Sequence, residues 1–532
     1  MILKEKVDLK NLNLFSSLVK DYSSQKKTLS PLLSSFPSKE SILNKIKKTK
    51  FSNELRSDLV SVFKKQYKET IFFNSNLKKV NKNIGRLLLD NTYTITTGHQ
   101  LSLFANPLFL IYKIINIINL SLEISKISKK NIIPVFWLAS EDHDFDEIKS
   151  FNLFSNKYNW DKVNNNSPVG LIETKGIDVF IEKFFSSFDD YPYKKELKKI
   201  LIKTYCKNSN LSNAFRSLLT YFFGNSGLLI LDPNERVLKK HFIPSFKEEI
   251  LNQTSFDLVS KQSVKMSKDY KSTVNPRELN LFYIKQKKRV RLLVKKKKYY
   301  LLDGTKEWNK KSILEEINNF PERFSPNVIL RTLYQETILP NIVYVAGPSE
   351  ISYWLQFKSL FSYMKKELPI LSLRSFVLNI NKSDWEILKK NKINTIDLFN
   401  PLDYFLSKSL YKKSKINLID ELNLMNKISE SINKKTKKID SSLNVHSSVI
   451  LKKIEKDLRK LEKKLIKYQK KDHFEYLDLL TQIHSSVYQK NIIQERSFSF
   501  FSFYLKYGNK FFKILSKKLN CLESGYIILK GF

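Results

Sequence analysis

The segment TITTGHQLSLFANPLFLIYK, from Thr94 to Lys113, joins two patterns that together decide the fold. Its first residues are β-formers without polar alternation, which is typical of a buried strand. Gly98 follows, one of only 11 glycines in 532 residues, and glycine allows a tight turn or the close approach of a ligand. Asn106 can then cap a helix whose first residue is Pro107, and the apolar residues after it predict about five helical turns. The segment therefore predicts a strand, a turn and a helix.

The chain contains five apolar runs that lack alternation and end in turn residues, as buried parallel strands do. They are YTITTG (93–98), IIPVFWLAS (132–140), GLLILD (227–232), NIVYVAG (341–347) and PILSLR (369–374). Helical patterns follow the first and the fourth run, and Ser349 can cap the helix after the fourth. Strand followed by helix, repeated in this way, predicts an α/β fold with a Rossmann-like open parallel sheet.

The unequal spacing of these strands predicts the domain organisation. One helical crossover needs only a few dozen residues, so the long intervals before the third and fourth strands should hold connecting subdomains, at about 155–222 and 250–325. The alternating RVRLLV and KYYLLDG in the second interval favour a small antiparallel sheet. We expect the core to cover 1–384, an α-helical coiled-coil domain to cover 385–500, and the segment 501–532 to pack back on the core.

Heptad spacing in the helical region predicts the coiled coil. The stronger apolar stripe consists of Leu451, Ile454, Leu458, Leu461, Leu465 and Tyr468, and the weaker one upstream of Met425, Ile428, Ile432 and Ile439. Two consecutive stripes are most simply an antiparallel helical hairpin with lysines on its solvated face. Because a seam of this length can also join two subunits, we expect a homodimer.

The basic composition does not by itself indicate nucleic acid as a partner. The net charge is +41 and the pI is near 9.8, but the basic residues are mostly lysine and are spread along the whole chain with abundant Asn, Ile, Phe and Tyr, a bias that A+T-rich codons produce. Proteins that read a base sequence favour clustered arginine. We therefore expect no dedicated nucleic-acid partner, and we keep a non-catalytic basic coiled-coil protein that binds nucleic acid as an alternative function.

The sequence also indicates a cytoplasmic location. No window reaches the ~20 consecutive apolar residues of a spanning helix, since Lys113 interrupts the longest run, and the amino terminus lacks an apolar secretory core. Cys206 and Cys521 are the only cysteines, which excludes a disulfide scaffold, and their lack of CxxC spacing excludes a zinc ribbon. We expect no membrane partner and no protein-bound metal site.

Polar, turn-forming residues stand at three of the five predicted strand ends. They lie in 98–100 after the first strand, 141–144 after the second and 347–350 after the fourth. Open parallel sheets bind ligands outside the carboxyl ends of their strands. We therefore expect these three segments to gather around a common cavity on one rim of the sheet.

The ends of the first and fourth strands offer groups suited to an anionic ligand, because loops and helix amino termini present free N–H groups. The expected cofactor-binding residues are Thr97, Gly98, Asn106, Lys113 and Gly347. The expected substrate-binding residues are Gln100, Ser349, Glu350 and Arg331. His99 is a candidate catalytic residue that could steady a phosphate, and TTGH matches the TxGH pattern of class I nucleotidyltransferases. In the structural alternative, His99 bonds a carbonyl and Lys113 extends to the surface.

The segment SEDHDFDE (140–147) concentrates five carboxylates around one histidine. Such a cluster is costly unless a cation or a cationic substrate shares the space. We expect Asp142, His143 and Asp144 to be catalytic, with His143 as a general base whose pKa the neighbouring carboxylates raise, and Glu141 to bind substrate. The alternative is an acidic helix start favoured by the helix dipole.

Taken together, these segments resemble the bacillithiol-biosynthesis cysteine-adding enzymes. The resemblance rests on TTGHQLSLFANPLFLIYK, PVFWLASEDHDFDEI, VNPRELNLFY, FSPNVILRTLYQETILPN, YVAGPSEISYWLQFKSLF and IIQERSFSFFSF, in order from about Tyr93 to Phe503. Two departures stand out. The family also accepts glutamine at the position of His99, and its usual GxGE appears here as GPSE, with Ser349 in place of a glycine.

The resemblance implies a nucleotidyltransferase-type core, connecting subdomains and a coiled coil that pairs subunits. It also implies a ligase that joins L-cysteine to glucosaminyl-malate in the last step of bacillithiol biosynthesis. Because forming an amide from a carboxylate and an amine is uphill in water, the cysteine carboxyl must be activated, so we expect ATP, accompanied by Mg²⁺, or a cysteine donor activated beforehand. The alternative enzyme is a nucleotidyltransferase or synthetase that acts on another small acid.

Overall fold

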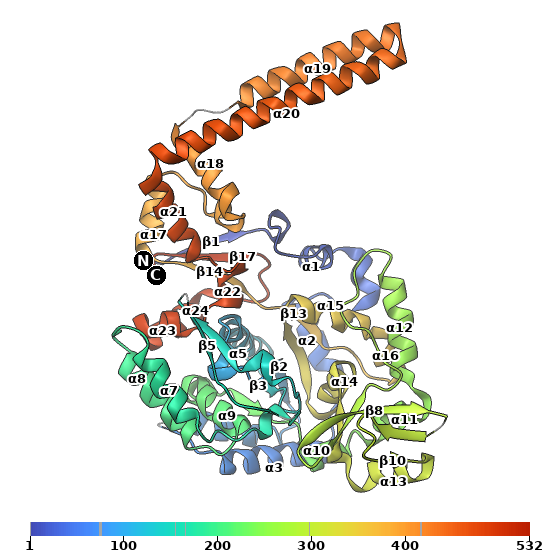
Figure 1. The fold of residues 1–532 in the computed structure, drawn as a ribbon. Helices are drawn as coiled ribbons and strands as arrows, with labels where there is room; N and C mark the ends of the chain where they lie inside the picture. Colours follow the sequence, from blue (N-terminus) through green and yellow to red (C-terminus); the bar gives the residue numbers. More distant parts are fainter. Residues whose placement is uncertain (1, 74–76, 155, 165, 297, 415–417) are drawn as a thin grey trace. The chain divides into compact units, whose positions relative to one another are not determined.

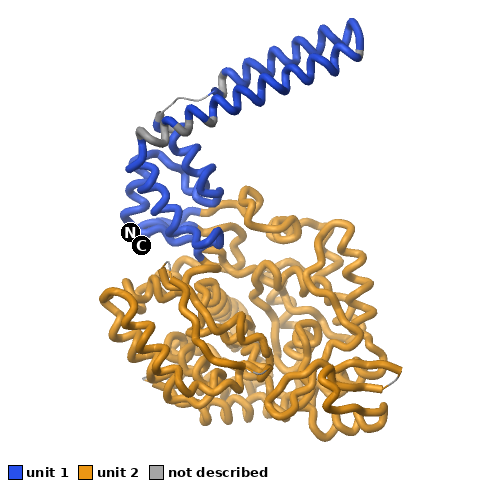
Figure 2. The backbone as a smooth tube through the Cα atoms, in the orientation of Figure 1, with its two compact units in different colours: residues 1–5, 378–494, 528–532 blue, residues 6–377, 495–527 orange. Residues whose placement is uncertain are grey.

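A computed structural model (Figure 1) describes residues 2–73, 77–154, 156–164, 166–296, 298–414 and 418–532. The chain divides into two compact units, coloured separately in Figure 2. The larger unit consists of residues 6–377 and 495–527, and the smaller unit of residues 1–5, 378–494 and 528–532. Each unit is described by itself below.

The larger unit is built on a five-stranded sheet in which all neighbouring strands are parallel. Its strands are β2 (Thr92–His99), β3 (Asn131–Leu138), β6 (Leu229–Leu231), β12 (Asn341–Ala346) and β13 (Ile370–Leu373). They lie in the order β13-β12-β2-β3-β6. Counted along the chain, this is the order 3-2-1-4-5 of a Rossmann sheet. The five predicted strands and the predicted fold class are confirmed.

Helix α5 (Phe109–Ser128) follows β2 and packs against β2 and β3, and α24 (Asn509–Lys518) packs against α5. Twelve of the 20 residues of α5 are buried, among them Lys113 and Asn116. A helix that is apolar on most of its surface needs such cover on several sides. Neither α5 nor any other helix in the described ranges is long and apolar enough to cross a membrane.

The predicted starts of two helices are wrong. Helix α5 begins at Phe109 without a side-chain cap, because the amide of Asn106 instead donates to the carbonyl oxygens of Leu103 and Phe104. Helix α15 (Pro348–Gln356) has Gly347 as its N-cap, with Ser349 already inside the first turn. The carboxylate of Glu350, the third residue of the helix, accepts from the Gly347 N–H at 2.6 Å, as the N3 residue of a capping box does.

The two long intervals hold additional elements, as their length predicts. The first contains the hairpin β4 (Ser150–Leu153) and β5 (Asn156–Asn159) with helices α7 (Ile177–Ser186), α8 (Lys194–Leu201) and α9 (Leu211–Phe223). The second contains a five-stranded antiparallel sheet, in the order β10-β9-β8-β7-β11, which confirms the predicted antiparallel piece. Its strands are β7 (Leu281–Lys285), β8 (Lys288–Lys295), β9 (Lys298–Leu301), β10 (Glu307–Trp308) and β11 (Phe324–Pro326).

The remaining helices of the larger unit cover these sheets. They are α1 (Ser17–Ser23), α2 (Lys39–Lys48), α3 (Asn53–Glu69), α4 (Lys78–Arg86), α6 (Phe145–Ile148), α10 (Arg236–Lys240), α11 (Ile243–Asn252), α12 (Thr254–Met266), α13 (Lys310–Asn319), α14 (Val328–Ile338), α16 (Lys358–Tyr363) and α23 (Phe501–Tyr507). In the core, Trp137 of β3 meets Tyr334 of α14 edge to face, with ring centroids 5.7 Å apart. Both rings are buried, so this contact holds α14 near the carboxyl end of β3.

The smaller unit is mainly helical. Its helices are α17 (Lys382–Lys390), α18 (Leu402–Ser414), α19 (Ile419–Ile439), α20 (Ser441–Asp472) and α21 (Phe474–Ser485), with the short strands β15 (Tyr488–Gln489) and β16 (Ile492–Ile493). A three-stranded sheet consists of β1 (Leu3–Val7), β17 (Tyr526–Lys530) and β14 (Phe376–Ile380). Helix α22 (Gln494–Ser497) follows β16. The division into two units passes through β1, β14, β17 and α22, so each of these elements has residues in both units.

Helices α19 and α20 form the predicted antiparallel hairpin, joined at Asp440 (Figure 1). Within the hairpin Met425 and Leu451 are buried, but other members of the predicted stripes are not. The exposed members are Ile428, Ile439, Ile454, Leu461 and Tyr468, whose exposed fractions run from 44% to 75%. The apolar stripes are therefore longer than one hairpin closes by itself.

Candidate active site

A large cavity lies where the order of the Rossmann sheet reverses, between the carboxyl ends of β2 and β12. Its volume is about 770 Å³. The first strand end contributes Gly98, His99 and Gln100, and the fourth contributes Gly347, Ser349 and Glu350. In an open α/β sheet this switch point is the place where ligands bind. Arg331, Arg374 and Arg496 complete its charged wall.

A second cavity of about 320 Å³ adjoins the first and shares Trp137, Ala139 and Arg331 with it. The end of the second strand lines this cavity with Glu141, Asp142 and His143. The side chain of Gln100 connects the two, because its amide donates to Asp142 and to Glu147, each at 2.8 Å. The prediction that 98–100, 141–144 and 347–350 gather on one rim is confirmed, with two adjoining cavities in place of one.

His99 is a neutral imidazole at the floor of the larger cavity. Its Nδ1 lies 3.1 Å from the carbonyl oxygen of Gln100, and its ring meets Phe109 edge to face at 5.3 Å. Burial, and next the positive charge of Lys113, lower the pKa of His99 to about 4. His99 therefore contacts a carbonyl oxygen, as the structural alternative predicted, and also lines the cavity, as the functional interpretation predicted.

Lys113 neither extends to the surface nor reaches the larger cavity. Its Nζ donates to Glu350 at 2.6 Å and to the carbonyl oxygen of Gly98 at 2.7 Å, with the side chain 1% exposed. Glu350 also accepts from the Tyr344 hydroxyl at 2.6 Å. Burial raises the pKa of Glu350, but the charge of Lys113 and the hydrogen bonds from Lys113, Tyr344 and the Gly347 N–H together outweigh burial, so the pKa is lowered and the carboxylate is ionised. Lys113 therefore supports the strand end from beneath.

Two of the three cavity arginines form no ion pair with a carboxylate of the described residues. Arg331 donates only to the neutral Gln335 and Tyr353, at 3.3 and 3.2 Å, and Arg496 is exposed and makes no ion pair in the described part of the chain. Arg374 differs, because both its terminal nitrogens bond the carboxylate of Glu495, at 2.6 and 2.9 Å. The larger cavity is therefore electropositive around Arg331 and Arg496.

The acidic segment 141–147 is more engaged than its sequence suggests. Glu141 forms a buried ion pair with Lys239, whose side chain is fully buried. Asp142 accepts from the backbone N–H of His143 at 2.8 Å as well as from Gln100. Burial raises the pKa of Asp142, but the bond from Gln100 and the charge of Arg289 outweigh burial, so its pKa is lowered and the carboxylate is ionised.

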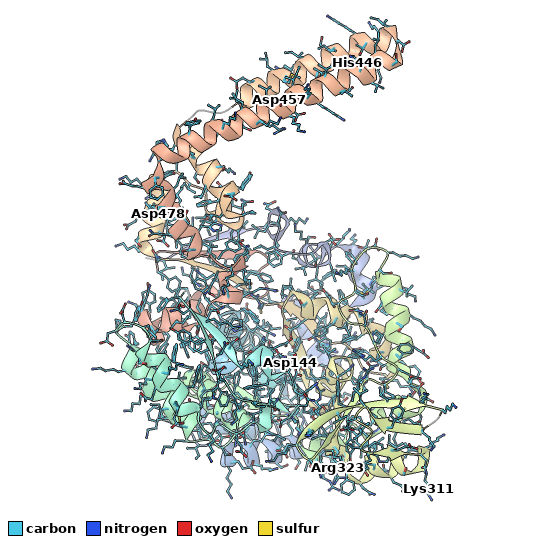
Figure 3. All side chains as sticks on the ribbon, in the orientation of Figure 1. Asp144, Lys311, Arg323, His446, Asp457 and Asp478 are labelled. Atoms are coloured by element: carbon cyan, nitrogen blue, oxygen red, sulfur yellow. The ribbon has the colours of Figure 1, made fainter. Side chains whose placement is uncertain are left out.

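Asp144, labelled in Figure 3, accepts from the backbone N–H of Glu147 and caps the short helix α6. The alternative of an acidic helix start is therefore realised at this residue. Asp144, Asp146 and Glu147 are exposed and line an open hollow of about 700 Å³ next to Asp142. Asp146 pairs with Lys149 at 2.6 Å. The segment keeps a net negative charge toward this hollow.

The expected rise in the pKa of His143 is wrong. Burial, and next the positive charge of Arg289, lower the pKa, and they outweigh the adjacent Asp142 and Asp144. The guanidinium Nη1 of Arg289 lies 3.2 Å from Nδ1 of His143. The sequence offered no sign of this contact, because Arg289 belongs to the inserted sheet, 146 positions further along the chain.

Arg289, Lys239, Arg374, Glu495 and Arg496 are site residues that sequence reasoning missed. Arg289 stands in the alternating RVRLLV, and Glu495 and Arg496 stand in IIQERSFSF. The sequence patterns of both segments are informative, but they do not indicate that these residues belong to the site. The scarcity of arginine in a lysine-rich chain is the signal that could have found the three arginines, whereas no such signal marks Lys239 or Glu495. It identified Arg331 in the same way.

Besides Lys113, two more predicted cofactor-binding residues lie outside the cavities. The hydroxyl of Thr97 donates to the carbonyl oxygen of Val345 at 2.7 Å and is buried inside the sheet. Asn106 is buried in the turn before α5. Gly98 and Gly347 do line the larger cavity, where they present backbone to a ligand.

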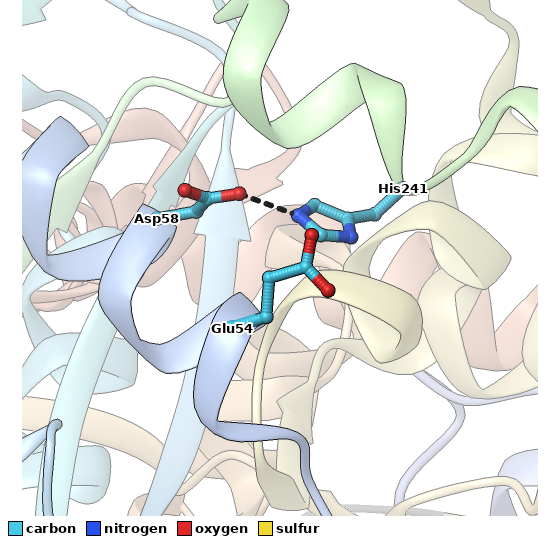
Figure 4. A group of neighbouring side chains, drawn as sticks. All are labelled: Glu54, Asp58 and His241. Atoms are coloured by element: carbon cyan, nitrogen blue, oxygen red, sulfur yellow. Dashed lines mark hydrogen bonds and ion pairs between the residues drawn. The ribbon is translucent and has the colours of Figure 1, made fainter.

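The described residues contain one group with the spacing of metal ligands, and it lies apart from these cavities. Glu54 and Asp58 stand one turn apart on α3 and face His241, with one ligand atom of each residue within 4.8 Å of the others (Figure 4). Nε2 of His241 is 2.7 Å from Asp58. In the described ranges the carboxylates of the segment 141–147 form no such group.

Comparisons with known proteins agree with this architecture. The family model "Bacillithiol biosynthesis BshC, N-terminal Rossmann-like domain" matches residues 2–375, and "Bacillithiol biosynthesis BshC, C-terminal coiled-coil domain" matches residues 377–531. The proteins named "Putative cysteine ligase BshC" from Flavobacterium johnsoniae, Flavobacterium psychrophilum and Cytophaga hutchinsonii are 37%, 36% and 32% identical to this chain. The alignments cover 97%, 97% and 94% of this chain and the same shares of those proteins. Both family matches and the relatives extend over nearly the whole sequence, so the chain belongs to the BshC family of bacillithiol biosynthesis.

Proposed function

We propose that this protein joins the carboxyl group of L-cysteine to the amino group of glucosaminyl-malate, as the last step of bacillithiol biosynthesis. The observation that carries the proposal is a pair of adjoining sites of opposite charge on the rim of one sheet. Glucosaminyl-malate has anionic carboxylates at one end and a basic amine at the other, so one molecule can reach both sites. The relatives carry the name "Putative cysteine ligase BshC", and this name supports the same chemistry.

The positive site would bind the malate part. Arg331 lines both cavities and holds an uncompensated charge, so it can pair with a carboxylate that lies beside the amine site. An arginine and a carboxylate form two parallel hydrogen bonds, which orient the bound group as well as attract it. Gln335 and Tyr353 hold the guanidinium in place without neutralising it.

The negative site would bind the amine as an ammonium ion and bring it to the reaction centre. Asp142 is ionised, and Gln100 orients its carboxylate from the His99 side. Asp144 and Glu147 add negative charge on the open side. Holding two small substrates in reacting geometry can supply about 7–11 kcal/mol of the barrier reduction. Asp142, Asp144 and Glu147 would therefore lower the barrier mainly by positioning the amine.

The proposal includes ATP, because an unactivated carboxylate does not form an amide in water. When bound, ATP supplies the phosphoryl or adenylyl group that makes the cysteine carboxyl reactive. A cavity of about 770 Å³ is large enough for a nucleotide. Arg496 and the N-terminus of α15, next to the side-chain-free Gly98 and Gly347, would hold its phosphates. Mg²⁺ would accompany those phosphates.

The experiment is an assay of bacillithiol formation from purified protein, L-cysteine, glucosaminyl-malate, ATP and Mg²⁺, with the product measured by thiol chromatography. We expect turnover by the wild type. We expect kcat/KM to fall about 10- to 100-fold in Arg331→Met and in Asp142→Asn, the loss of one charged hydrogen bond. The matched control is Arg459→Met, an exposed arginine of α20, which should keep full activity.

Two results would contradict the proposal. Wild-type turnover in both variants would remove Arg331 and Asp142 from the site. The second result is product formation without ATP, from a cysteine donor activated beforehand such as charged tRNA. That result would exclude the proposed role of ATP but would still agree with the proposed amide product. Calorimetry with ATP and Mg²⁺ measures nucleotide binding separately from turnover.

The proposal extends to the assembly and location of the protein. A second copy of the hairpin α19–α20 would cover the exposed apolar residues of the stripes and form a homodimer. Both cysteines, Cys206 and Cys521, are free thiols, which suits the reducing cytoplasm where cysteine and ATP are available.

A further inference from the structure

The hydrogen bonds of the two site histidines define which ring nitrogen carries the proton. Nδ1 of His143 lies 3.2 Å from Nη1 of Arg289. A guanidinium has five N–H donors and no acceptor, so Nδ1 of His143 must offer its lone pair in this contact. The proton of the neutral ring is therefore on Nε2. That nitrogen makes no hydrogen bond to the described part of the chain, and His143 lines two of the site's hollows.

Arg289 is held rigidly enough to maintain this arrangement. Its side chain is 7% exposed. Nε donates to the Ser325 hydroxyl at 2.9 Å, and Nη2 donates to the carbonyl oxygen of Pro326 at 3.0 Å. The guanidinium also lies 3.9 Å from the centre of the Phe282 ring. Since these partners belong to β7 and β11 of the inserted sheet, three strands fix the nitrogen that faces His143.

His99 has the opposite arrangement. A carbonyl oxygen only accepts hydrogen bonds, so Nδ1 of His99 carries the proton that is donated to Gln100. The free Nε2 of His99 is therefore an acceptor, whereas the free Nε2 of His143 is a donor. The two rings are joined through Gln100, which bonds Asp142 beside His143. The site thus presents two imidazole Nε2 atoms: that of His99 accepts a hydrogen bond, and that of His143 donates one.

We propose that Arg289 is a positioning residue that keeps His143 as a hydrogen-bond donor, and that His143 is a catalytic residue that stabilises the oxyanion of amide formation through Nε2–H. The proposal rests on the proposed function. It replaces the general-base role expected from the sequence, because a ring whose Nδ1 is occupied and whose Nε2 is protonated has no lone pair to offer.

The reaction step places the electrons as follows. The bound ammonium of glucosaminyl-malate first releases one proton to water. The resulting amine nitrogen forms the new C–N bond with its lone pair, and the π pair of the activated cysteine carbonyl moves onto oxygen. The Nε2–H of His143 donates to that oxygen while it is negative. The pair then returns to re-form the C=O bond, the activating group leaves with its bonding pair, and the ammonium proton passes to water. His143 keeps its own proton throughout.

Substitutions at His143 separate a donor from a base. The amide of His143→Gln can place an N–H near the position of Nε2–H but cannot take up a proton, whereas the carboxylate of His143→Glu is an acceptor and a base. We expect kcat of H143Q to stay within about tenfold of the wild type and kcat of H143E to fall about 100-fold or more, the usual loss of one oxyanion donor. The reverse order of the two variants would overturn the proposal.

Variants of the arginine test the positioning. Arg289→Met should lower kcat with little change in KM, and Arg289→Lys should restore part of it. The matched control is Arg291→Met, two residues along the same strand β8, which should keep wild-type kinetics. Melting temperatures of all variants separate loss of folding from loss of positioning. Equal losses in R289M and R291M would show a structural effect only and would overturn the role of Arg289.

The tautomer can be measured without any assay of function. In protein labelled with ¹⁵N-histidine, the ring signals absent from H143Q belong to His143. We expect an unprotonated Nδ1 and a protonated Nε2 in the wild type at neutral pH, and a mixture of tautomers in R289M. A protonated Nδ1 in the wild type would overturn the proposal. If the wild type formed no bacillithiol, the proposed function would fail while these signals still decided the tautomer.

Discussion

His99, which lines the larger cavity, and Lys113, which lies beneath it, show how burial acts on two neighbouring basic side chains. Burial lowers the pKa of both side chains, to about 4 for His99. Lys113 keeps its charge because the Glu350 carboxylate is 2.6 Å away, whereas the ring of His99 contacts a neutral carbonyl oxygen and the ring of Phe109. One compensated ion pair and one neutral ring therefore lie side by side. A ligand at this floor meets a hydrogen-bond acceptor and no bare charge from either residue.

The low pKa of His99 predicts a pH dependence of stability. Between pH 6.5 and about 4 the unfolded chain binds a proton at this ring and the folded protein does not, so stability falls as the pH falls through this window. The full difference is worth roughly 3 kcal/mol. In His99→Gln, the residue that the family also accepts here, this contribution is absent. Melting temperatures of the two proteins from pH 7.5 to 4.5 measure it.

The wild type should lose stability relative to H99Q as the pH is lowered through this range. Two melting curves that stay parallel with pH would contradict the buried, neutral state of His99. Above pH 7 the difference between the two proteins should be constant, which gives the experiment its internal reference.

The pairing of β2 with β3 explains the glycine at the end of the first strand. Gly98 stands opposite Trp137 in the register of the two strands. A Cβ at Gly98 would lie 3.2 Å from the carbonyl oxygen and 3.3 Å from the Cβ of Trp137. These distances are shorter than ordinary van der Waals contact. The glycine is thus required by packing inside the sheet as well as by the cavity that it lines.

Gly98→Ala should therefore lower stability by about 1–3 kcal/mol, the usual cost of overpacking a buried site, and lower kcat/KM because the strand end moves. The matched control is Gly85→Ala in α4, where a Cβ would meet nothing within 4 Å. That change should raise stability by about 0.5–1 kcal/mol, since alanine favours a helix over glycine. Thermal unfolding and the ligase assay measure both. A G98A protein as stable as the wild type would contradict the crowding at Trp137.

At the scale of the whole molecule, the order of the strands assembles the site. Strands β2 and β12 are neighbours in the sheet although 247 or 248 positions separate the residues that pair. Their neighbourhood brings Gly98 beside Gly347 and leads the chain away on both sides, which opens the cavity between them. The inserted sheet then brings Arg289 to His143. No single segment of the chain contains the site.

The hairpin predicts how the molecule assembles. Val449 and Ile454 of α20 are 62% and 44% exposed. If a second copy covers them, Val449→Glu together with Ile454→Glu should convert a dimer into a monomer, because each buried carboxylate would lack a partner. The matched control is Lys453→Glu, an exposed position between them, which should remain dimeric. Light scattering after size exclusion gives the mass. A wild type that is monomeric at micromolar concentration would contradict the homodimer.

The sequence by itself determined the elements: the five buried strands, the polar strand ends and the helical hairpin. These follow from periodicity and turn chemistry among near neighbours, which each segment carries within itself. Only the tertiary structure decided the strand order, the ion pairs of Lys113 with Glu350 and of Glu141 with Lys239, and the contact of Arg289 with His143. Their partners are 237, 98 and 146 positions apart. In a chain with 93 basic residues, charge alone does not tell which one meets a given carboxylate or imidazole, because packing of the intervening elements makes that choice.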